Sequence, residues 1–319
     1  MVKVLYVAGS GRSGSTILDN ILGQVDGVVS AGEVRFLWER GIVGDRLCGC
    51  GEPFSACPRW QAVMAHLGDV DPARMIDLLR RGTRARHLPM LLRLRRRPAL
   101  ALERLGELPG VLASLYAAIA EETGARVIVD SSKLPPYGEL LRHVPGIDVA
   151  YVHLIRDPRA TAYSWLRAKP LPERDGGQMQ RQGAAKSAAL WTLWNTAAEL
   201  LWGRDPARYL RVRYEDLLAA PQPALARMLG LVGEPADGLP FVSPTEVSLR
   251  PTHGVAGNPS RFTTGVVALR ADTEWRDRMH LRDRTVVAAL SWPLLLRHGY
   301  VGRPAPLAPD ATAAAGPDV

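Results

Sequence analysis

Residues 4–16 read VLYVAGSGRSGST, a short apolar run followed by glycine and serine around one arginine. Val4 to Val7 predict a buried strand, and the residues from Ile17 to Val25 have apolar side chains at helical spacing. Glycine allows the tight turn that must join the two, and backbone N–H groups at a helix N-terminus favour negative charge. We therefore predict an anion-binding loop made by Gly11, Arg12, Ser13, Gly14, Ser15 and Thr16.

The spacing from Gly9 to Gly14 matches the P-loop pattern, but Ser15-Thr16 replaces the Lys-Ser/Thr pair that ends it. Arg12 could supply the missing cation, because a guanidinium group can bind a phosphate or sulfate through two hydrogen bonds. A glycine-rich turn without a ligand is the structural alternative. The order of strand, loop and helix favours the anion site.

Length and composition predict one large domain. The chain has 319 residues, 47% of them hydrophobic, and we expect a single α/β domain over residues 1–301 and a disordered tail over 302–319. No apolar run is long enough for a membrane span, and the N-terminal run is too short for a signal peptide, so we expect a cytoplasmic protein. The net charge of +8 suits an anionic ligand, although a solvated basic surface would give the same charge. We expect no nucleic-acid partner.

Strand and helix patterns alternate along the chain. Residues 125–130, 147–155 and 208–212 predict three further strands, and residues 184–203 predict a helix between the last two. This alternation is typical of a P-loop-type, mostly parallel sheet flanked by helices, with ligands at the carboxyl ends of the strands. We expect acceptor-binding insertions within 34–70, 80–104 and 165–185, where the sheet pattern fades.

A second anion-binding signal follows the strand that ends near Ile155. Arg156 should emerge at the carboxyl edge of the sheet, and Asp157 can cap the next helix. Ser164 lies about two helical turns further on and could offer its hydroxyl to the same anion. The alternative is an Arg156–Asp157 ion pair and a solvent-facing serine.

Together these segments resemble the sulfotransferases that use 3′-phosphoadenosine 5′-phosphosulfate (PAPS). The segment GSGRSGST resembles their 5′-phosphosulfate loop, and RDPRATAYS resembles their 3′-phosphate motif, with Arg156 and Ser164 at the family spacing. The turn RYED resembles the family turn whose tyrosine, here Tyr214, lies near the adenine. Residues 253–261, HGVAGNPSR, are similar to a late loop of bacterial members that closes over the nucleotide. The resemblance implies that Asn258 and Arg261 bind the donor, with Arg261 on the 3′-phosphate.

Transfer to an alcohol needs a base and a cation near the leaving oxygen. Glu33 should return to the mouth of the site, and its GE-x-R segment resembles that of the tyrosylprotein sulfotransferases, which implies a catalytic base. A surface pair with Arg35 is the alternative. We expect Lys133, just after a strand, to stabilise the leaving oxygen. If Glu33 is not the base, His153 or His253 would be the next candidates.

These residues predict transfer of a sulfuryl group from PAPS to a hydroxyl of a small molecule, such as a secondary metabolite, a glycan or a lipid, without an essential metal. Asp130 ends an apolar strand like a Mg²⁺-binding acid, so a P-loop small-molecule kinase is one alternative. A nucleotide-sensing module without turnover is another. The oligomeric state and the acceptor stay open.

Two segments have no assigned catalytic role. Cys48, Cys50 and Cys57 could be free thiols, a disulfide pair or zinc ligands with His66 as a remote fourth ligand, and free thiols are the default in the cytoplasm. The arginine-rich segment 80–104 could touch anionic lipid at a membrane surface, although a solvated helical face is the simpler interpretation.

Overall fold

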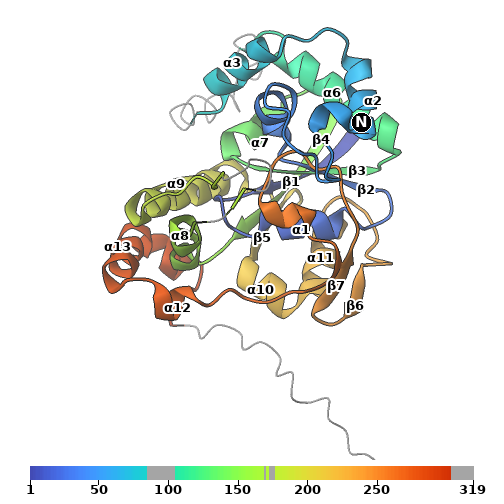
Figure 1. Cartoon of the computed structure of the whole chain (residues 1–319). Helices are drawn as coiled ribbons and strands as arrows, with labels where there is room; N and C mark the ends of the chain where they lie inside the picture. Colours follow the sequence, from blue (N-terminus) through green and yellow to red (C-terminus); the bar gives the residue numbers. More distant parts are fainter. Residues whose placement is uncertain (85–104, 169, 172–176, 303–319) are drawn as a thin grey trace, which may run out of the picture.

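A five-stranded parallel sheet forms the centre of the computed structural model (Figure 1), which describes residues 1–84, 105–168, 170–171 and 177–302. The strands follow the order β2-β3-β1-β4-β5, and every neighbouring pair is parallel. Their bounds are β1 Val2–Ala8, β2 Val28–Gly32, β3 Val127–Lys133, β4 Ile147–Ile155 and β5 Tyr209–Arg213. The predicted α/β class with a parallel sheet is confirmed.

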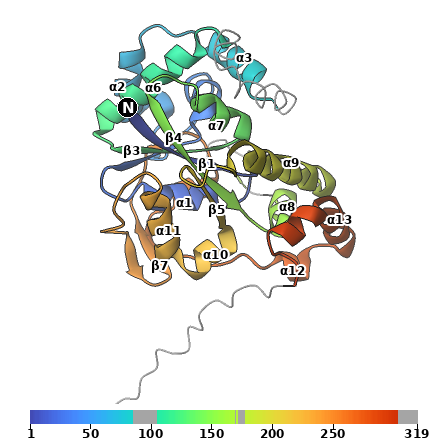
Figure 2. The ribbon, with the colours of Figure 1, turned by 180° about the vertical axis from the view of Figure 1, so that it is seen from behind.

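Helices cover both faces of the sheet, as the view from behind also shows (Figure 2). The main helices are α1 Ser15–Leu22, α2 Pro58–Leu67, α3 Pro72–Gly82, α6 Leu108–Thr123, α7 Pro135–Leu141, α8 Pro158–Leu166, α9 Ala184–Trp202, α10 Tyr214–Ala219, α11 Pro221–Gly230, α12 Trp275–Arg278 and α13 Leu281–Arg297. Short helical turns occur at η1 Val34–Phe36, η2 Leu37–Ile42, η3 Phe54–Ala56 and η5 Pro259–Phe262.

Strand β1 shows why helices must pack against both faces of the sheet. Val4 and Tyr6 belong to a core shared with α6, α7 and α9, whereas Leu5 and Val7 belong to a core shared with α1, α10 and α11. All four side chains are fully buried, because successive residues of a strand point to opposite faces. A continuous apolar run is therefore what a central parallel strand requires.

Several details differ from the sequence-based expectations. Strand β2 was not predicted, because Val28–Gly32 contains small and polar residues rather than an apolar run. Lys133 is the last residue of β3 and not a residue beyond it. A small antiparallel sheet of β6 Phe241–Ser243, β7 Glu246–Leu249 and β8 Gly265–Ala268 was also not predicted.

Some predictions concern residues outside the described part. These are most of the arginine-rich segment 80–104 and almost all of the tail from 302 to 319, so the single domain over 1–301 stays a prediction. Where the chain is described, no helix has both the length and the apolar character needed to cross a membrane.

Candidate active site

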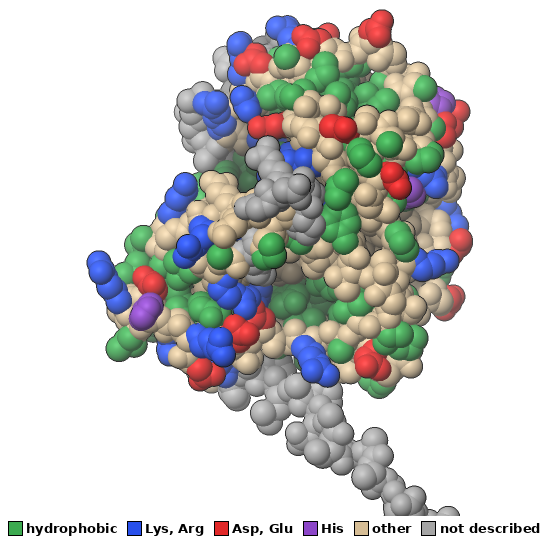
Figure 3. Space-filling model, in the orientation of Figure 1, with side chains coloured by type: hydrophobic (Ala, Val, Ile, Leu, Met, Phe, Trp, Pro, Cys, Tyr) green, Lys and Arg blue, Asp and Glu red, His purple; other side chains and the backbone are tan. Residues whose placement is uncertain are grey.

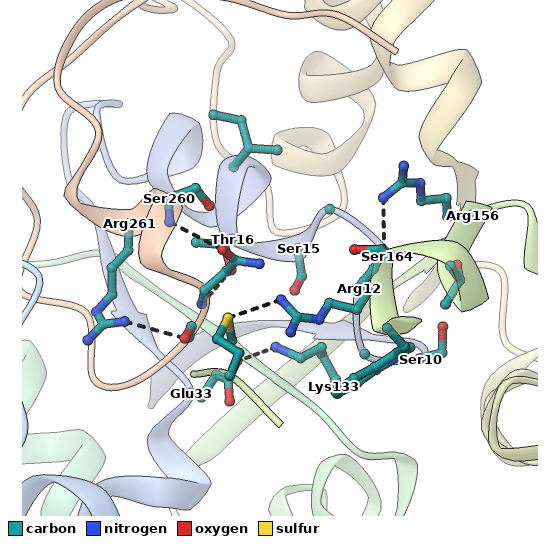
Figure 4. A pocket seen from close by; sticks show the side chains of 18 of the residues that line it. Ser10, Arg12, Ser15, Thr16, Glu33, Lys133, Arg156, Ser164, Ser260 and Arg261 are labelled. Atoms are coloured by element: carbon teal, nitrogen blue, oxygen red, sulfur yellow. Dashed lines mark hydrogen bonds and ion pairs between the residues drawn. The ribbon is translucent and has the colours of Figure 1, made fainter. Parts of the chain in front are cut away.

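A cavity of about 870 Å³ opens at the carboxyl ends of the central strands. Figure 3 shows the hollow on this face of the molecule, and Figure 4 shows the side chains that line it. Almost every residue predicted from the sequence lines this one cavity, from segments far apart in the chain: Gly11, Arg12, Gly14, Ser15, Thr16, Glu33, Lys133, Arg156, Ser164, Tyr214, Asn258 and Arg261. Ser13 is buried but is not part of the lining.

The glycine loop between β1 and α1 is shaped by close backbone approaches. A Cβ atom at Gly9 would lie 2.4 Å from the carbonyl oxygen of Leu154, and one at Gly14 would lie 2.2 Å from the ring of Tyr214. Both glycines also have positive φ angles, which other residues rarely adopt. The loop can therefore keep this shape only with glycine at the two positions.

Several buried polar atoms around this loop lack a hydrogen-bond partner in the described part of the chain. They include Ser10 Oγ, Arg12 Nε, Thr161 Oγ1 and Ser187 Oγ, and all four residues line the cavity. Because a buried polar atom without a partner is costly, these donors fit a ligand rich in anionic oxygens.

Arg12 extends into the cavity from a strained backbone. Its φ angle is 67°, in the left-handed region that a residue with a Cβ disfavours. The guanidinium lies 4.6 Å from the ring centroid of Trp165, and Nη1 is 3.3 Å from the sulfur of Met179. Burial lowers the pKa of Arg12, and no carboxylate in the described chain lies within ion-pair distance of it. This cation is thus available to an anionic ligand.

Glu33 and Lys133 form an ion pair where the neighbouring strands β2 and β3 end. Lys133 Nζ donates to Glu33 Oε1, while Arg40 Nη1 lies 3.6 Å from Glu33 Oε2. Glu33 is only 7% exposed, and its backbone N–H donates to the carbonyl of Val255 at 2.7 Å. The alternative of a surface pair with Arg35 is wrong, since Arg35 Nε donates instead to Thr83 Oγ1.

The charges around Glu33 determine its protonation. Burial raises the pKa of this carboxyl, but Lys133, Arg40 and Arg261 together outweigh burial, and its pKa lies below the ordinary value. Glu33 is therefore ionised at neutral pH. The backbone places Lys133 beside the glycine loop, because the Lys133 carbonyl accepts from the N–H of Gly9 at 3.1 Å.

Arg156 and Ser164 lie on the other side of the loop. Arg156 Nη1 donates to the carbonyl of Arg12 at 3.2 Å, Nη2 lies 3.6 Å from Asp272 Oδ2, and the guanidinium is 5.1 Å from the ring centroid of Tyr214. Ser164 is buried and lines the cavity, so a solvent-facing serine is wrong.

Asp157 does cap α8, as predicted. Its carboxylate accepts from the N–H of Arg159 at 2.8 Å and also binds the Arg159 guanidinium, which excludes the alternative pairing with Arg156. The Arg156 side chain can therefore point into the cavity.

Arg261 does not join Arg156 and Ser164. Figure 4 shows Arg261 and Arg156 on opposite sides of the glycine loop. Arg261 donates to the carbonyls of Gly257 and Leu47, and its charge lowers the pKa of Glu33. Arg270, in contrast, lines the cavity two residues before Asp272, the partner of Arg156.

Asn258 holds the late loop against the glycine loop. Its N–H lies 3.4 Å from Thr16 Oγ1, and its side chain accepts from the N–H of Ser260 at the start of η5. Tyr214 lies against Gly14 at the mouth of the same loop. Both residues thus lie around the glycine loop, and their roles in donor binding stay predictions.

The remaining candidates are engaged elsewhere. Asp130 is fully buried, accepts from Tyr116 and Ser132, and does not line the cavity, so its carboxylate does not face a nucleotide site. Burial raises the pKa of Asp130 to about 6. His153 is held between Tyr209 and Asn195, and burial lowers its pKa to about 3. Neither His153 nor His253 lines the cavity.

The three cysteines lie together, and their histidine neighbour is His253. The expectation of His66 as the fourth ligand is wrong, because His66 Nε2 contacts Glu122 Oε1 at 2.5 Å on the surface. All three cysteines are free.

The sequence reasoning missed Phe36, Arg40, Thr161 and Asp272, which also line the cavity, and it noted Arg270 only as a residue that follows the late loop. Arg40 and Phe36 follow Glu33 within two helical turns, so helical spacing after a candidate base could have found them. No comparable local signal exists for Asp272.

The structure thus combines a parallel sheet, a glycine loop after its first strand and several cations around one cavity. The family model described as the sulfotransferase family matches residues 5–238, and the chain belongs to this family. A search of curated proteins gives no significant match.

One of two similar solved structures supports the fold. The sulfotransferase domain from the curacin biosynthetic pathway is 17% identical, with a TM-score of 0.52 over 92% of this chain and 98% of that chain. The sulfotransferase domain from the Synechococcus PCC 7002 olefin synthase is 20% identical, with a TM-score of 0.48 over 91% and 94%.

Proposed function

We propose that this sulfotransferase moves the sulfuryl group of PAPS directly, in line, onto a hydroxyl of a small-molecule acceptor. The observation that carries the proposal is the Lys133–Glu33 ion pair, buried in the same cavity as Arg12. A carboxylate base and a cation side by side are what hydroxyl activation and leaving-group stabilisation require. A sensor that binds without turnover would need neither.

The donor would be held by two groups of residues. Arg12, Ser15 and Thr16, with the backbone N–H groups of the loop, suit the phosphosulfate, and the unpartnered atoms around the loop support this assignment. Arg156 and Ser164 suit the 3′-phosphate on the other side. We assign Arg270 to this second group in place of Arg261, since Arg270 lies near the Arg156–Asp272 pair.

PAPS would supply a sulfuryl group already attached to a good leaving group. Glu33 accepts the proton of the acceptor hydroxyl, and Lys133 and Arg12 offset the negative charge that develops on the leaving oxygen. When Lys133 Nζ turns away from Glu33, the carboxylate loses a cation that lowers its pKa, and it becomes a stronger base. Lys133 would thus link activation of the acceptor hydroxyl to stabilisation of the leaving oxygen.

The acceptor side of the cavity combines apolar and basic side chains. Phe36, Leu171 and Trp194 line it together with Arg40 and Arg46, which suits a molecule with an apolar body and an acidic or polar group. We propose a secondary metabolite, a glycan or a lipid. None of the three cysteines forms a disulfide, which supports the cytoplasm as the compartment.

Calorimetry with three nucleotides tests the proposal. We expect 3′,5′-bisphosphoadenosine, the desulfonated product, to bind more tightly than AMP, because a lost charge-assisted hydrogen bond costs about 1.5 to 3 kcal/mol. ATP with Mg²⁺ serves as the control for the kinase alternative. Equal affinity for bisphosphoadenosine and AMP, or tighter binding of Mg-ATP than of both, would overturn the donor assignment.

A further inference from the structure

Four potential metal ligands meet between two loops that are far apart in the sequence. Cys48, Cys50 and Cys57 come from residues 48–57, and His253 comes from the late loop that leads to η5. Their three sulfurs and one imidazole nitrogen all lie within 4.8 Å of one another. The site is separate from the cavity, because none of the four residues lines it.

Three of the six distances between the ligand atoms are close to those of a tetrahedral metal site. The sulfurs of Cys50 and Cys57 are 3.8 Å apart, and His253 Nδ1 lies 3.8 Å from Cys48 Sγ and 3.3 Å from Cys57 Sγ. With zinc–sulfur bonds of about 2.3 Å and zinc–nitrogen bonds of about 2.0 Å, the ligand atoms of a tetrahedron are about 3.5 to 3.8 Å apart. A disulfide would need about 2.05 Å between two sulfurs.

The backbone holds both loops in position around this cluster. A Cβ at Gly49 would lie 2.7 Å from the carbonyl of Thr252, so only glycine lets the cysteine loop approach the late loop this closely. Gly49 N–H donates to the carbonyl of Gly254 at 3.1 Å, and Trp60 Nε1 donates to the carbonyl of His253 at 2.7 Å. These contacts therefore hold the backbone of His253 beside the cysteine loop.

We propose that Cys48, Cys50, Cys57 and His253 bind one structural Zn²⁺ ion in a closed Cys₃His site. Thiolate and imidazole ligands in tetrahedral geometry are typical of zinc, and four protein ligands leave no open position for catalysis. On binding, each cysteine thiol loses a proton and the neutral histidine contributes Nδ1, so about three protons are released per zinc. This inference rests on the four ligands alone and does not depend on the proposed function.

A metal at this position would fasten the late loop to the core. Val255 lies two residues after His253, forms a bridge with Gly32, and accepts from the N–H of Glu33. The cysteine loop also touches the late loop further on, because Arg261 Nη2 donates to the carbonyl of Leu47 at 3.1 Å. Zinc would therefore stabilise the backbone that positions Glu33 without touching the reacting atoms.

Metal analysis of the full chain tests the proposal. After expression with added zinc, removal of any affinity tag and extensive dialysis, we expect about one zinc per chain by mass spectrometry. Cobalt substitution should give the visible absorption bands of tetrahedral, thiolate-bound Co²⁺. A strong chelator should lower the melting temperature of the wild type, and zinc should restore it.

Variants separate the four ligands from their surroundings. Cys50→Ser and His253→Ala should each lose most of the zinc, whereas His253→Cys should retain it as a Cys₄ site. His66→Ala is the matched control and should keep the wild-type metal content. If a variant does not fold, the wild-type cobalt spectrum and zinc content still decide the question.

Three outcomes would overturn the proposal. These are a wild-type protein with negligible zinc after supplementation, an intact Cys50–Cys57 disulfide in peptide mapping under non-reducing conditions, or wild-type zinc content in both Cys50→Ser and His253→Ala.

Discussion

Lys133, the last residue of β3, donates its ammonium group to the carboxylate of Glu33, the first residue after the neighbouring strand β2. Both strands end at the edge where the glycine loop begins, and the Lys133 backbone is itself bound to Gly9 of that loop. Sheet pairing therefore holds together the carboxylate and the ammonium group that we propose as base and cation, next to the glycine loop, and substitutions can test each role.

Glu33→Gln should reduce turnover on an alcohol acceptor by about 10² to 10⁴-fold, because general-base catalysis typically contributes that much. Affinity for bisphosphoadenosine should stay near the wild-type value in calorimetry. Glu39→Gln is the matched control, since Glu39 is exposed and pairs with Arg80. Wild-type turnover by Glu33→Gln would remove Glu33 from the mechanism.

Lys133→Met should lower the turnover number and also shift its pH dependence. Lys133 is the strongest of the cations that lower the pKa of Glu33, so its loss raises that pKa. Because the base must be ionised, the acidic limb of the pH–rate profile should move to higher pH. An unmoved acidic limb would mean that the limb does not report Glu33.

Arg156→Ala should weaken bisphosphoadenosine binding by about 1.5 to 3 kcal/mol and leave AMP binding much less affected. Because Arg156 also donates to the carbonyl of Arg12, Ser164→Ala serves as a second variant that spares this contact. Arg261→Ala should leave the preference for the 3′-phosphate intact. Loss of this preference in Arg261→Ala alone would restore the role that the sequence assigned to Arg261.

Arg12→Asn should lower turnover without lowering stability. The left-handed backbone costs Arg12 roughly 1 to 2 kcal/mol, and asparagine tolerates it better. Chemical denaturation should therefore give an equal or higher free energy of unfolding, while Arg12→Lys recovers part of the activity. A large loss of stability in Arg12→Asn would make Arg12 a structural residue.

Asp19→Asn should stabilise the protein more at pH 8 than at pH 5. Burial raises the pKa of Asp19 to about 7, although a hydrogen bond from Ser30 opposes the effect. The native state thus holds a proton that the unfolded chain has released above about pH 4, so this group makes stability fall as the pH rises from 4 to 7. Asparagine has no proton to lose. Equal changes in melting temperature at both pH values would show that Asp19 keeps an ordinary pKa.

The sequence predicted the parts of the site that depend on local patterns. The glycine loop, the helix cap at Asp157 and the emergence of Arg156 from a strand each follow from a few neighbouring residues, and the structure has all three. Glu33 was found by a family resemblance. Strand β2, which ends just before Glu33, was not predicted. Val28–Gly32 forms a strand through pairing with β3 and not through its own propensity.

Residues that come into contact only in the tertiary structure were not predicted. His253 reaches Cys57 across 196 positions, and Asp272 reaches Arg156 after a separate small sheet. No local sequence pattern predicts such contacts, because the residues involved are far apart in the chain. The resemblance grouped Arg261 with Arg156, although the two lie on opposite sides of the glycine loop, because a motif gives the order of residues along the chain but not their positions in space. The role of Arg261 stays a prediction.

The residues that line the cavity come from two kinds of segment, strand ends and connections, and substitutions in the two have different consequences. One wall consists of residues at the ends of β1, β3 and β4, where each side chain depends on sheet register. The other includes Phe36, Arg40, Leu171 and Met179, from connections outside the sheet. Substitutions at Leu171 and Met179 can alter which molecule fits, whereas Phe36 also packs against the hydrophobic core. Under the proposed function, changes in these connections would alter the acceptor, while the strand ends would go on holding the donor.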